Sequence, residues 1–101
     1  MLIVGDFNAH LGIIIPDTLN DNGKTLLEWL EHYNLTLLNN DPKCKGTYTW
    51  SSRGQKSIIE YAIINQKMYQ NFNHMNIDDV NEILGTSDNN LIEVKLQKSQ
   101  K

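Results

Sequence analysis

The chain has a single cysteine and no long hydrophobic run, and each shortage excludes a class of protein. Cys44 is the only cysteine, so no disulfide can form within the chain, and a reducing compartment is expected. No apolar run approaches the roughly 20 residues that a membrane helix requires, and the N-terminus does not resemble a secretory signal. We therefore expect a soluble protein without a membrane segment, located inside the cell, in the nucleus or the cytoplasm.

Positive charge is also scarce. The 9 Lys and Arg residues are outnumbered by 12 Asp and Glu residues, which gives a formal net charge of −3. This composition argues against a protein that holds nucleic acid by overall charge alone. Any contact with phosphate must therefore depend on a local basic patch or on a metal ion. With 101 residues, the chain is long enough for one domain with one core.

The most informative stretch is an apolar strand that ends in polar groups. The run from Leu2 to Val4 predicts a strand covered on both faces, and Gly5 leaves room for close approach. Side chains alternate along an extended chain, so Asp6 and Asn8 are expected to project together from the strand end. A simpler interpretation is that Asp6 caps the following turn through a local side-chain hydrogen bond.

The rest of the chain alternates helix and strand signals without a linker. Apolar residues with helical spacing predict a helix that begins after a cap at Asp21 or Asn22 and buries one stripe in the core. The stripe consists of Leu26, Trp29, Leu30 and Tyr33. Strands are predicted at 35–39, at 58–64 after Arg53-Gly54, at 76–80 and at 91–96, with a short helix at 66–71. This order predicts an α/β (α+β) domain.

Several motifs together resemble one nuclease family. Gly5-Asp6-Phe7-Asn8 resembles the signature of the exonuclease-endonuclease-phosphatase superfamily. Four further stretches follow the order of that family: Asn22 to Asn39, Thr47 to Trp50, Ser57 to Tyr61, and Ser87 to Leu91. The set is most similar to the endonuclease domain of LINE-type retrotransposons. It matches roughly the C-terminal half of the family domain, so residues 1–101 are expected to form a partial domain.

The resemblance implies half of a four-layer α/β sandwich, with a mixed β-sheet and one main helix on its outer face. Such a half would supply mostly one sheet, and the inner apolar face of that sheet would lack the second sheet. An exposed apolar patch on the order of several hundred Å² normally marks an interface or an aggregation hazard. We therefore expect association with the missing N-terminal half, or self-association through the exposed sheet face.

The resemblance also assigns catalytic roles. Asp6 corresponds to the proton-handling carboxylate beside the metal, and Asn8 to the amide that orients the phosphate. Asp88 corresponds to the aspartate of the family's Ser-Asp-His ending, so Asp6 and Asp88 are the expected ligands of Mg²⁺ or Mn²⁺. The family histidine is replaced by Asn89, and the aspartate that pairs with that histidine is replaced by Glu60. Asp6, Asn8 and Asp88 are expected to converge where a cation and a phosphoryl group are held.

The two replacements bear directly on activity. Asparagine cannot exchange a proton near neutral pH, and losing a general acid or base costs on the order of 100- to 10,000-fold in rate. Glu60 is one methylene longer than aspartate, and the metal-binding glutamate that the family supplies upstream is missing from the chain. We expect a divalent-metal-dependent DNA endonuclease fragment that is weak or inactive alone. The alternative is a catalytically silent remnant that binds nucleic acid or a protein partner.

A second candidate site is the segment from Lys43 to Lys56, which holds four of the nine basic residues and no acidic residue. Lys and Arg can contact phosphates while an aromatic ring stacks on an unpaired base. The candidate contacts with DNA are Lys43, Lys45, Tyr48, Trp50, Arg53 and Lys56. The alternative that remains open is a solvated hairpin whose Trp50 packs into the core.

Overall fold

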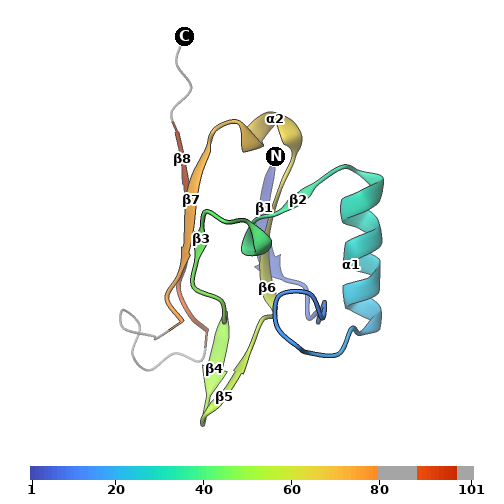
Figure 1. Ribbon diagram of the computed structural model, residues 1–101, viewed down its shortest axis with the longest axis vertical. Helices are drawn as coiled ribbons and strands as arrows, with labels where there is room; N and C mark the ends of the chain where they lie inside the picture. Colours follow the sequence, from blue (N-terminus) through green and yellow to red (C-terminus); the bar gives the residue numbers. More distant parts are fainter. Residues whose placement is uncertain (80–88, 98–101) are drawn as a thin grey trace.

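The computed structural model describes residues 1–79 and 89–97, and these form three layers (Figure 1). Sheet A is antiparallel and has the strand order β1 (Leu2–Asp6), β6 (Glu60–Ile64) and β2 (Thr36–Leu37). Helix α1 (Asp21–His32) lies against one side of sheet A. Sheet B lies on the other side and has the order β3 (Cys44–Lys45), β7 (Phe72–Ile77) and β8 (Ile92–Leu96). The predicted α+β class is confirmed.

The remaining elements are short. Strands β4 (Trp50–Ser52) and β5 (Gln55–Ser57) form a hairpin that extends from one end of the two sheets (Figure 1). Its turn residues Arg53 and Gly54 have φ angles of 51° and 80°, the left-handed pair that a tight two-residue hairpin requires. Helix α2 spans Gln66–Tyr69, and a 3₁₀ turn spans Leu38–Asn40. Among the described residues, the helices are too short and too polar to cross a lipid bilayer.

Two apolar clusters lie on the two faces of β6. Tyr61 and Ile63 pack toward α1, while Ala62 and Ile64 pack toward sheet B. The first cluster contains Ala9, Leu11, Leu26, Leu37, Ile58, Tyr61 and Ile63. The second contains Leu38, Ala62, Ile64, Phe72, Met75 and Ile77. The expectation of mostly one sheet with an uncovered inner face is therefore wrong, because β7 of the same chain covers that face.

The start of α1 differs from the prediction. The cap is Asn20 rather than Asp21 or Asn22, because Asn20 has an extended backbone and its Oδ1 accepts a hydrogen bond from the Gly23 N–H at 2.7 Å. The apolar stripe is buried at Leu26 but not at Tyr33, which is 59% exposed beyond the helix end. The predicted helix is thus confirmed, with its cap shifted and its last stripe residue outside the core.

Strand β2 is shorter than predicted because the 3₁₀ turn begins at Leu38. The side chain of Asn39 then takes over the pairing with β6. Its Nδ2 donates to the Glu60 carbonyl at 3.1 Å, and its Oδ1 accepts from the Ala62 N–H at 2.9 Å. One amide side chain therefore replaces the next residue pair of a strand and fixes the beginning of β6.

Candidate active site

Asp6 and Glu60 lie opposite each other at one end of sheet A. The register of β1 and β6 pairs these two residues, so their side chains project from the same face. Burial raises the pKa of the Glu60 carboxyl above its ordinary value, and the negative charge of Asp6 raises it further. The structure therefore brings together two of the five predicted catalytic residues.

Asp6 also holds the turn that follows β1. Its Oδ1 accepts a hydrogen bond from the Asn8 N–H at 2.8 Å, as the simpler interpretation of this residue predicts. The second carboxylate oxygen of Asp6 has no hydrogen bond to another described residue. Asn8 has a φ angle of 49° and lies beyond the strand end, so strand alternation does not set the direction of its side chain. One oxygen of Asp6 is thus structural, and the other is available for chemistry.

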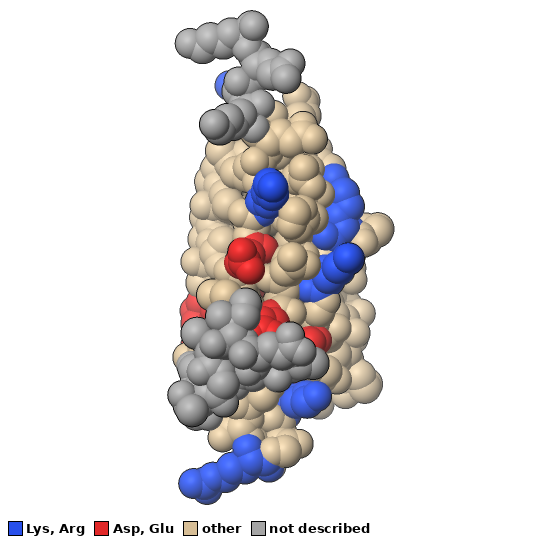
Figure 2. Space-filling view, turned by 90° about the vertical axis from the view of Figure 1, so that its left-hand side faces the viewer, with Lys and Arg blue, Asp and Glu red and all other residues tan. Residues whose placement is uncertain are grey.

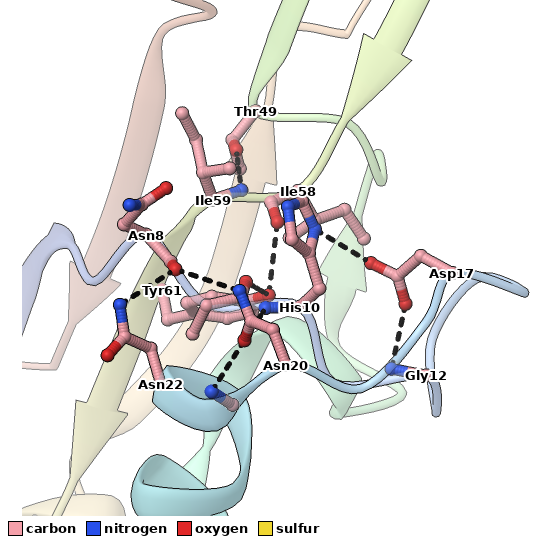
Figure 3. A network of polar contacts seen from close by, with 12 residues as sticks. Asn8, His10, Gly12, Asp17, Asn20, Asn22, Thr49, Ile58, Ile59 and Tyr61 are labelled. Carbon is pink, nitrogen blue, oxygen red and sulfur yellow. Dashed lines mark hydrogen bonds and ion pairs between the residues drawn. The ribbon is translucent and has the colours of Figure 1, made fainter.

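The N-terminus of α1 fixes the backbone of Asn8 (Figure 3). The Asn8 carbonyl accepts hydrogen bonds from the Nδ2 groups of Asn20 and Asn22, both at 3.2 Å. Asn20 Oδ1 also accepts from the His10 N–H at 2.9 Å. Figure 3 shows the Asn8 side chain directed away from the two clamping amides. The clamp therefore leaves the Asn8 amide exposed at the strand end.

The loop after Asn8 is held by further polar contacts (Figure 3). The buried Tyr61 hydroxyl lies 2.6 Å from the Ala9 carbonyl and 3.1 Å from the Ile58 carbonyl. Burial raises the pKa of Tyr61, and the charge of Asp17 adds to the increase, so the hydroxyl stays protonated as a donor. His10 Nδ1 lies 3.1 Å from Asp17 Oδ2, within hydrogen-bond distance, so this contact also holds the loop.

Thr49 connects sheet A to the hairpin beside Glu60. The residue is fully buried, and its Oγ1 accepts hydrogen bonds from the Ile59 N–H at 2.9 Å and the Glu60 N–H at 3.1 Å. Its carbonyl accepts from the Asn90 N–H at 2.9 Å. We did not predict this role, although Thr49 lies inside one of the family-like motifs. The only feature of the sequence that could have indicated this role is the position of a threonine between the aromatic residues Tyr48 and Trp50.

Asn90 anchors the segment that carries Asn89. Asn90 is 3% exposed, and its Nδ2 donates to the Tyr48 carbonyl at 2.8 Å and to Ser51 Oγ at 3.2 Å. Asn89 is exposed and forms an isolated antiparallel bridge with Trp50. Because Thr49 contacts both the Glu60 N–H and Asn90, these contacts link Asn89 to the end of sheet A that carries Asp6.

Two further predictions concern the binding of a metal ion. Asp88 lies outside the described residues, so its assignment as a metal ligand stays a prediction. Within residues 1–79 and 89–97, no group of three or more His, Cys, Asp or Glu side chains is arranged to hold a metal ion. Mg²⁺ often uses only one or two carboxylates, together with water and phosphate oxygens. The carboxylate of Asp6 fits such a partial ligand set.

The basic segment divides between two places in the fold. Lys43 and Lys45 border a hollow of about 270 Å³ on sheet B, which His74 and Asn76 of β7 complete. Arg53 lies in the hairpin turn, and Lys56 Nζ lies 5.5 Å from the ring centre of Tyr48. Tyr48 packs against the first apolar cluster, whereas Trp50 is partly buried. Figure 2 shows the side of the molecule that carries sheet B. Basic side chains lie along one margin of this side and continue to the end of the hairpin.

Comparisons with known proteins identify the family. The model of the endonuclease-reverse transcriptase family matches residues 1–93, which include Asp6, Asn8, Glu60, Asp88 and Asn89. No curated protein and no solved structure matches the chain. The match covers most of the sequence and confirms the resemblance to the exonuclease-endonuclease-phosphatase superfamily and its LINE-type endonucleases. The chain therefore belongs to the endonuclease-reverse transcriptase family.

Proposed function

We propose that this endonuclease-like domain binds the DNA backbone at the Asp6 end of sheet A and hydrolyses phosphodiesters slowly with a divalent cation. One observation carries the proposal. The carboxylates of Asp6 and Glu60 face the same side of paired strands, and the charge of Asp6 contributes to the raised pKa of Glu60. Uncompensated negative charge at an exposed strand end favours a cation, and a bound cation favours phosphate oxygens.

Each residue has a distinct task in this proposal. Mg²⁺ or Mn²⁺, when bound, supplies positive charge near the phosphoryl oxygens. The oxygen of Asp6 that is not used by the turn holds the cation, with Asp88 as a second ligand. The Asn8 amide donates a hydrogen bond to the phosphate. Glu60, whose pKa is raised, takes the proton of the attacking water.

Asn89 limits the rate. Its amide can donate a hydrogen bond to a phosphate oxygen, but it carries no positive charge and transfers no proton. Glu60 thus acts without the imidazole that the family places beside this carboxylate. A complete ligand set would need the glutamate of the family's upstream half, supplied by another chain or by a longer product. Slow turnover is therefore the expected behaviour of these 101 residues alone.

A nicking assay tests the proposal. Supercoiled DNA is incubated with the protein and Mg²⁺, and the expected result is slow nicking that Asp6→Ala abolishes. Asn89→His combined with Glu60→Asp restores the family pair and should raise the rate about 100-fold or more, the usual gain from a general acid or base. Asp21→Ala, an exposed acid in the first turn of α1, is the matched control and should change nothing. Activity that survives Asp6→Ala would reject the assigned site.

A binding module without catalysis is the second candidate, and the basic side chains that have no carboxylate partner favour it. Apart from the contact of His10 with Asp17, no salt bridge is found within the described residues, so no described carboxylate pairs with a described lysine or with Arg53. Lys43 is also held in place, because its Nζ donates to the Phe72 carbonyl at 3.2 Å and lies over the Tyr69 ring. An ordered ammonium group that has no carboxylate partner suits contact with a phosphate.

The salt dependence of DNA binding tests this second candidate. Replacing both Lys43 and Lys45 with Gln should lower the slope of log affinity against log salt by about two, one for each lost phosphate contact. Lys24→Gln, on the exposed side of α1, is the matched control and should leave the slope unchanged. Equal slopes for the double variant and the wild type would exclude this surface as the DNA contact.

A further inference from the structure

The outer side of sheet B carries a hollow whose lining follows from the strand register (Figure 2). In the parallel pairing of β3 with β7, Cys44 lies opposite Met75. Met75 is fully buried in the second apolar cluster, and Cys44 packs against that cluster. Because side chains alternate along a strand, the residues that flank this pair on both strands face outward. These four residues, which border the hollow of about 270 Å³, are Lys43, Lys45, His74 and Asn76.

The lining of this hollow is rich in hydrogen-bond donors. Each lysine offers three donors and no acceptor, and the amide of Asn76 offers two donors. Across the described part of the chain, no carboxylate forms a salt bridge with either lysine. The acid that the register places beside the hollow is Glu93 of β8, opposite Asn76. The lining therefore matches a ligand that consists of acceptors and carries negative charge.

The lysines also determine what can cover the hollow. An uncharged chain segment or an apolar ligand would bury two ammonium groups without a partner, and the burial of an unpaired charge is costly. A phosphate group instead presents several charged acceptor oxygens to the lysines and to the amide, and hydrogen bonds to charged groups are the strong ones. The hollow thus selects an oxyanion over an uncharged occupant.

His74 is the lining residue whose donor capacity changes near neutral pH. Its Nδ1 lies 2.9 Å from Asn73 Oδ1. An amide oxygen only accepts hydrogen bonds, so Nδ1 carries the proton of the neutral ring and Nε2 carries the lone pair. The neutral ring therefore presents an acceptor at Nε2, which repels an anion. Protonation converts Nε2 into a donor, and histidine side chains in general change charge near neutral pH.

We propose that this hollow binds one phosphate group, either free or part of a nucleic-acid strand, and that binding is coupled to protonation of His74. The charged groups that face His74 from the two neighbouring strands are Lys43, Lys45, Lys95 and Glu93. A bound phosphate offsets the repulsion between the imidazolium and the three lysines, so the phosphate and the proton bind cooperatively. The inference rests on the second candidate function, in which Lys43 and Lys45 contact DNA, and adds a dependence on pH.

Fluorescence anisotropy with a short thymidine oligonucleotide tests the coupling, because its phosphodiesters keep their charge between pH 6 and pH 8. The wild type should bind about tenfold more tightly at pH 6 than at pH 8, the value of one hydrogen bond to a charged group. His74→Gln should bind like the wild type at pH 8 and lose the gain at pH 6. Lys45→Gln should bind more weakly at both pH values. His32→Gln, at an exposed histidine in the last turn of α1, is the matched control and should keep the gain.

The variants separate this inference from the function on which it rests. A gain at pH 6 that persists in His74→Gln, or that His32→Gln removes, overturns the coupling. If Lys45→Gln still weakens binding in that case, the second candidate function stands without the inference. If neither Lys45→Gln nor His74→Gln changes binding, both are rejected.

NMR titration locates the site and distinguishes the two sources of phosphate. Inorganic phosphate and the oligonucleotide are added separately to the protein at pH 6, and each ligand that enters the hollow should shift the amide signals of Lys45, His74 and Asn76. Shifts with the oligonucleotide alone identify a nucleic-acid strand as the source, and shifts with inorganic phosphate alone identify the free ion. Unchanged signals at these three residues with both ligands overturn the proposal.

Discussion

Side chains that replace strand hydrogen bonds fix the position of Glu60. Beyond the two residues of β2, the open side of β6 is paired by the Asn39 amide and by Thr49 Oγ1. The strand pattern singled out Asp6 as a carboxylate at the end of an apolar strand, and the resemblance to the nuclease family assigned a role to Glu60. Sequence reasoning did not identify Thr49 or Asn39, because their partners lie 10 or more positions away and depend on tertiary structure.

Thr49→Val removes one hydroxyl and leaves two backbone donors unpaired. The partly buried Ile59 and Glu60 N–H groups lose their acceptor, and an unsatisfied group costs about 1–3 kcal/mol when it is buried. We expect a loss of about 2 kcal/mol or more in the free energy of unfolding, measured by urea denaturation. Thr49→Ser keeps the acceptor and should lose less. Thr47→Val is the matched control, and an equal loss there would contradict the role of Thr49.

Glu60→Gln should change the pH dependence of stability. Because folding raises the pKa of Glu60, the folded state favours the protonated carboxyl, and its contribution is lost as pH rises through the raised pKa. Gln stays neutral, so the variant should melt at a higher temperature than the wild type at pH 7. The difference should vanish below the ordinary pKa of 4.5. Equal differences at pH 7 and pH 4 would contradict the assignment.

At the scale of elements, periodic segments were predicted well and irregular ones were not. The apolar stripe of α1 and the alternation of residues in β6 predicted the bounds of these two elements nearly correctly. Strand β7 begins at Phe72 rather than at residue 76, because a register shift between Phe72 and His74 interrupts the two-residue period. The end of the predicted 76–80 strand, residue 80, lies outside the described residues.

The first turn of α1 links helix stability to the candidate site. Asn20→Ala removes the helix cap and the donor to the Asn8 carbonyl, and loss of a cap costs about 0.5–2 kcal/mol. We expect urea denaturation to show a loss near the upper end of that range. Asn20→Asp keeps the acceptor for the Gly23 N–H and should lose less. If Asn20→Ala proves as stable as the wild type, the clamp on Asn8 does not contribute.

At the scale of the whole molecule, one chain supplies a helix layer and two sheets. The resemblance predicted the fold class and placed Asp6 and Glu60 near one another, but not sheet B as cover for sheet A. That cover comes from Phe72, Met75 and Ile77, whose spacing fits neither a regular strand nor a helix. Likewise, the sequence suggests that the basic segment forms one patch. In the structure its residues lie partly at β3 and partly in the hairpin, because Gly46 to Thr49 separate these two elements.

The most direct test of the central claim, that the end of sheet A holds a divalent cation, is paramagnetic broadening by Mn²⁺ in NMR spectra. Low Mn²⁺ concentrations should broaden the amide signals of Asp6, Glu60 and Asn89, and should leave Asn65 and Lys67, at the other end of β6, sharp. Asp6→Ala should abolish the effect. Broadening centred on the exposed acids of α1, with Asp6 and Glu60 unaffected, would contradict the claim.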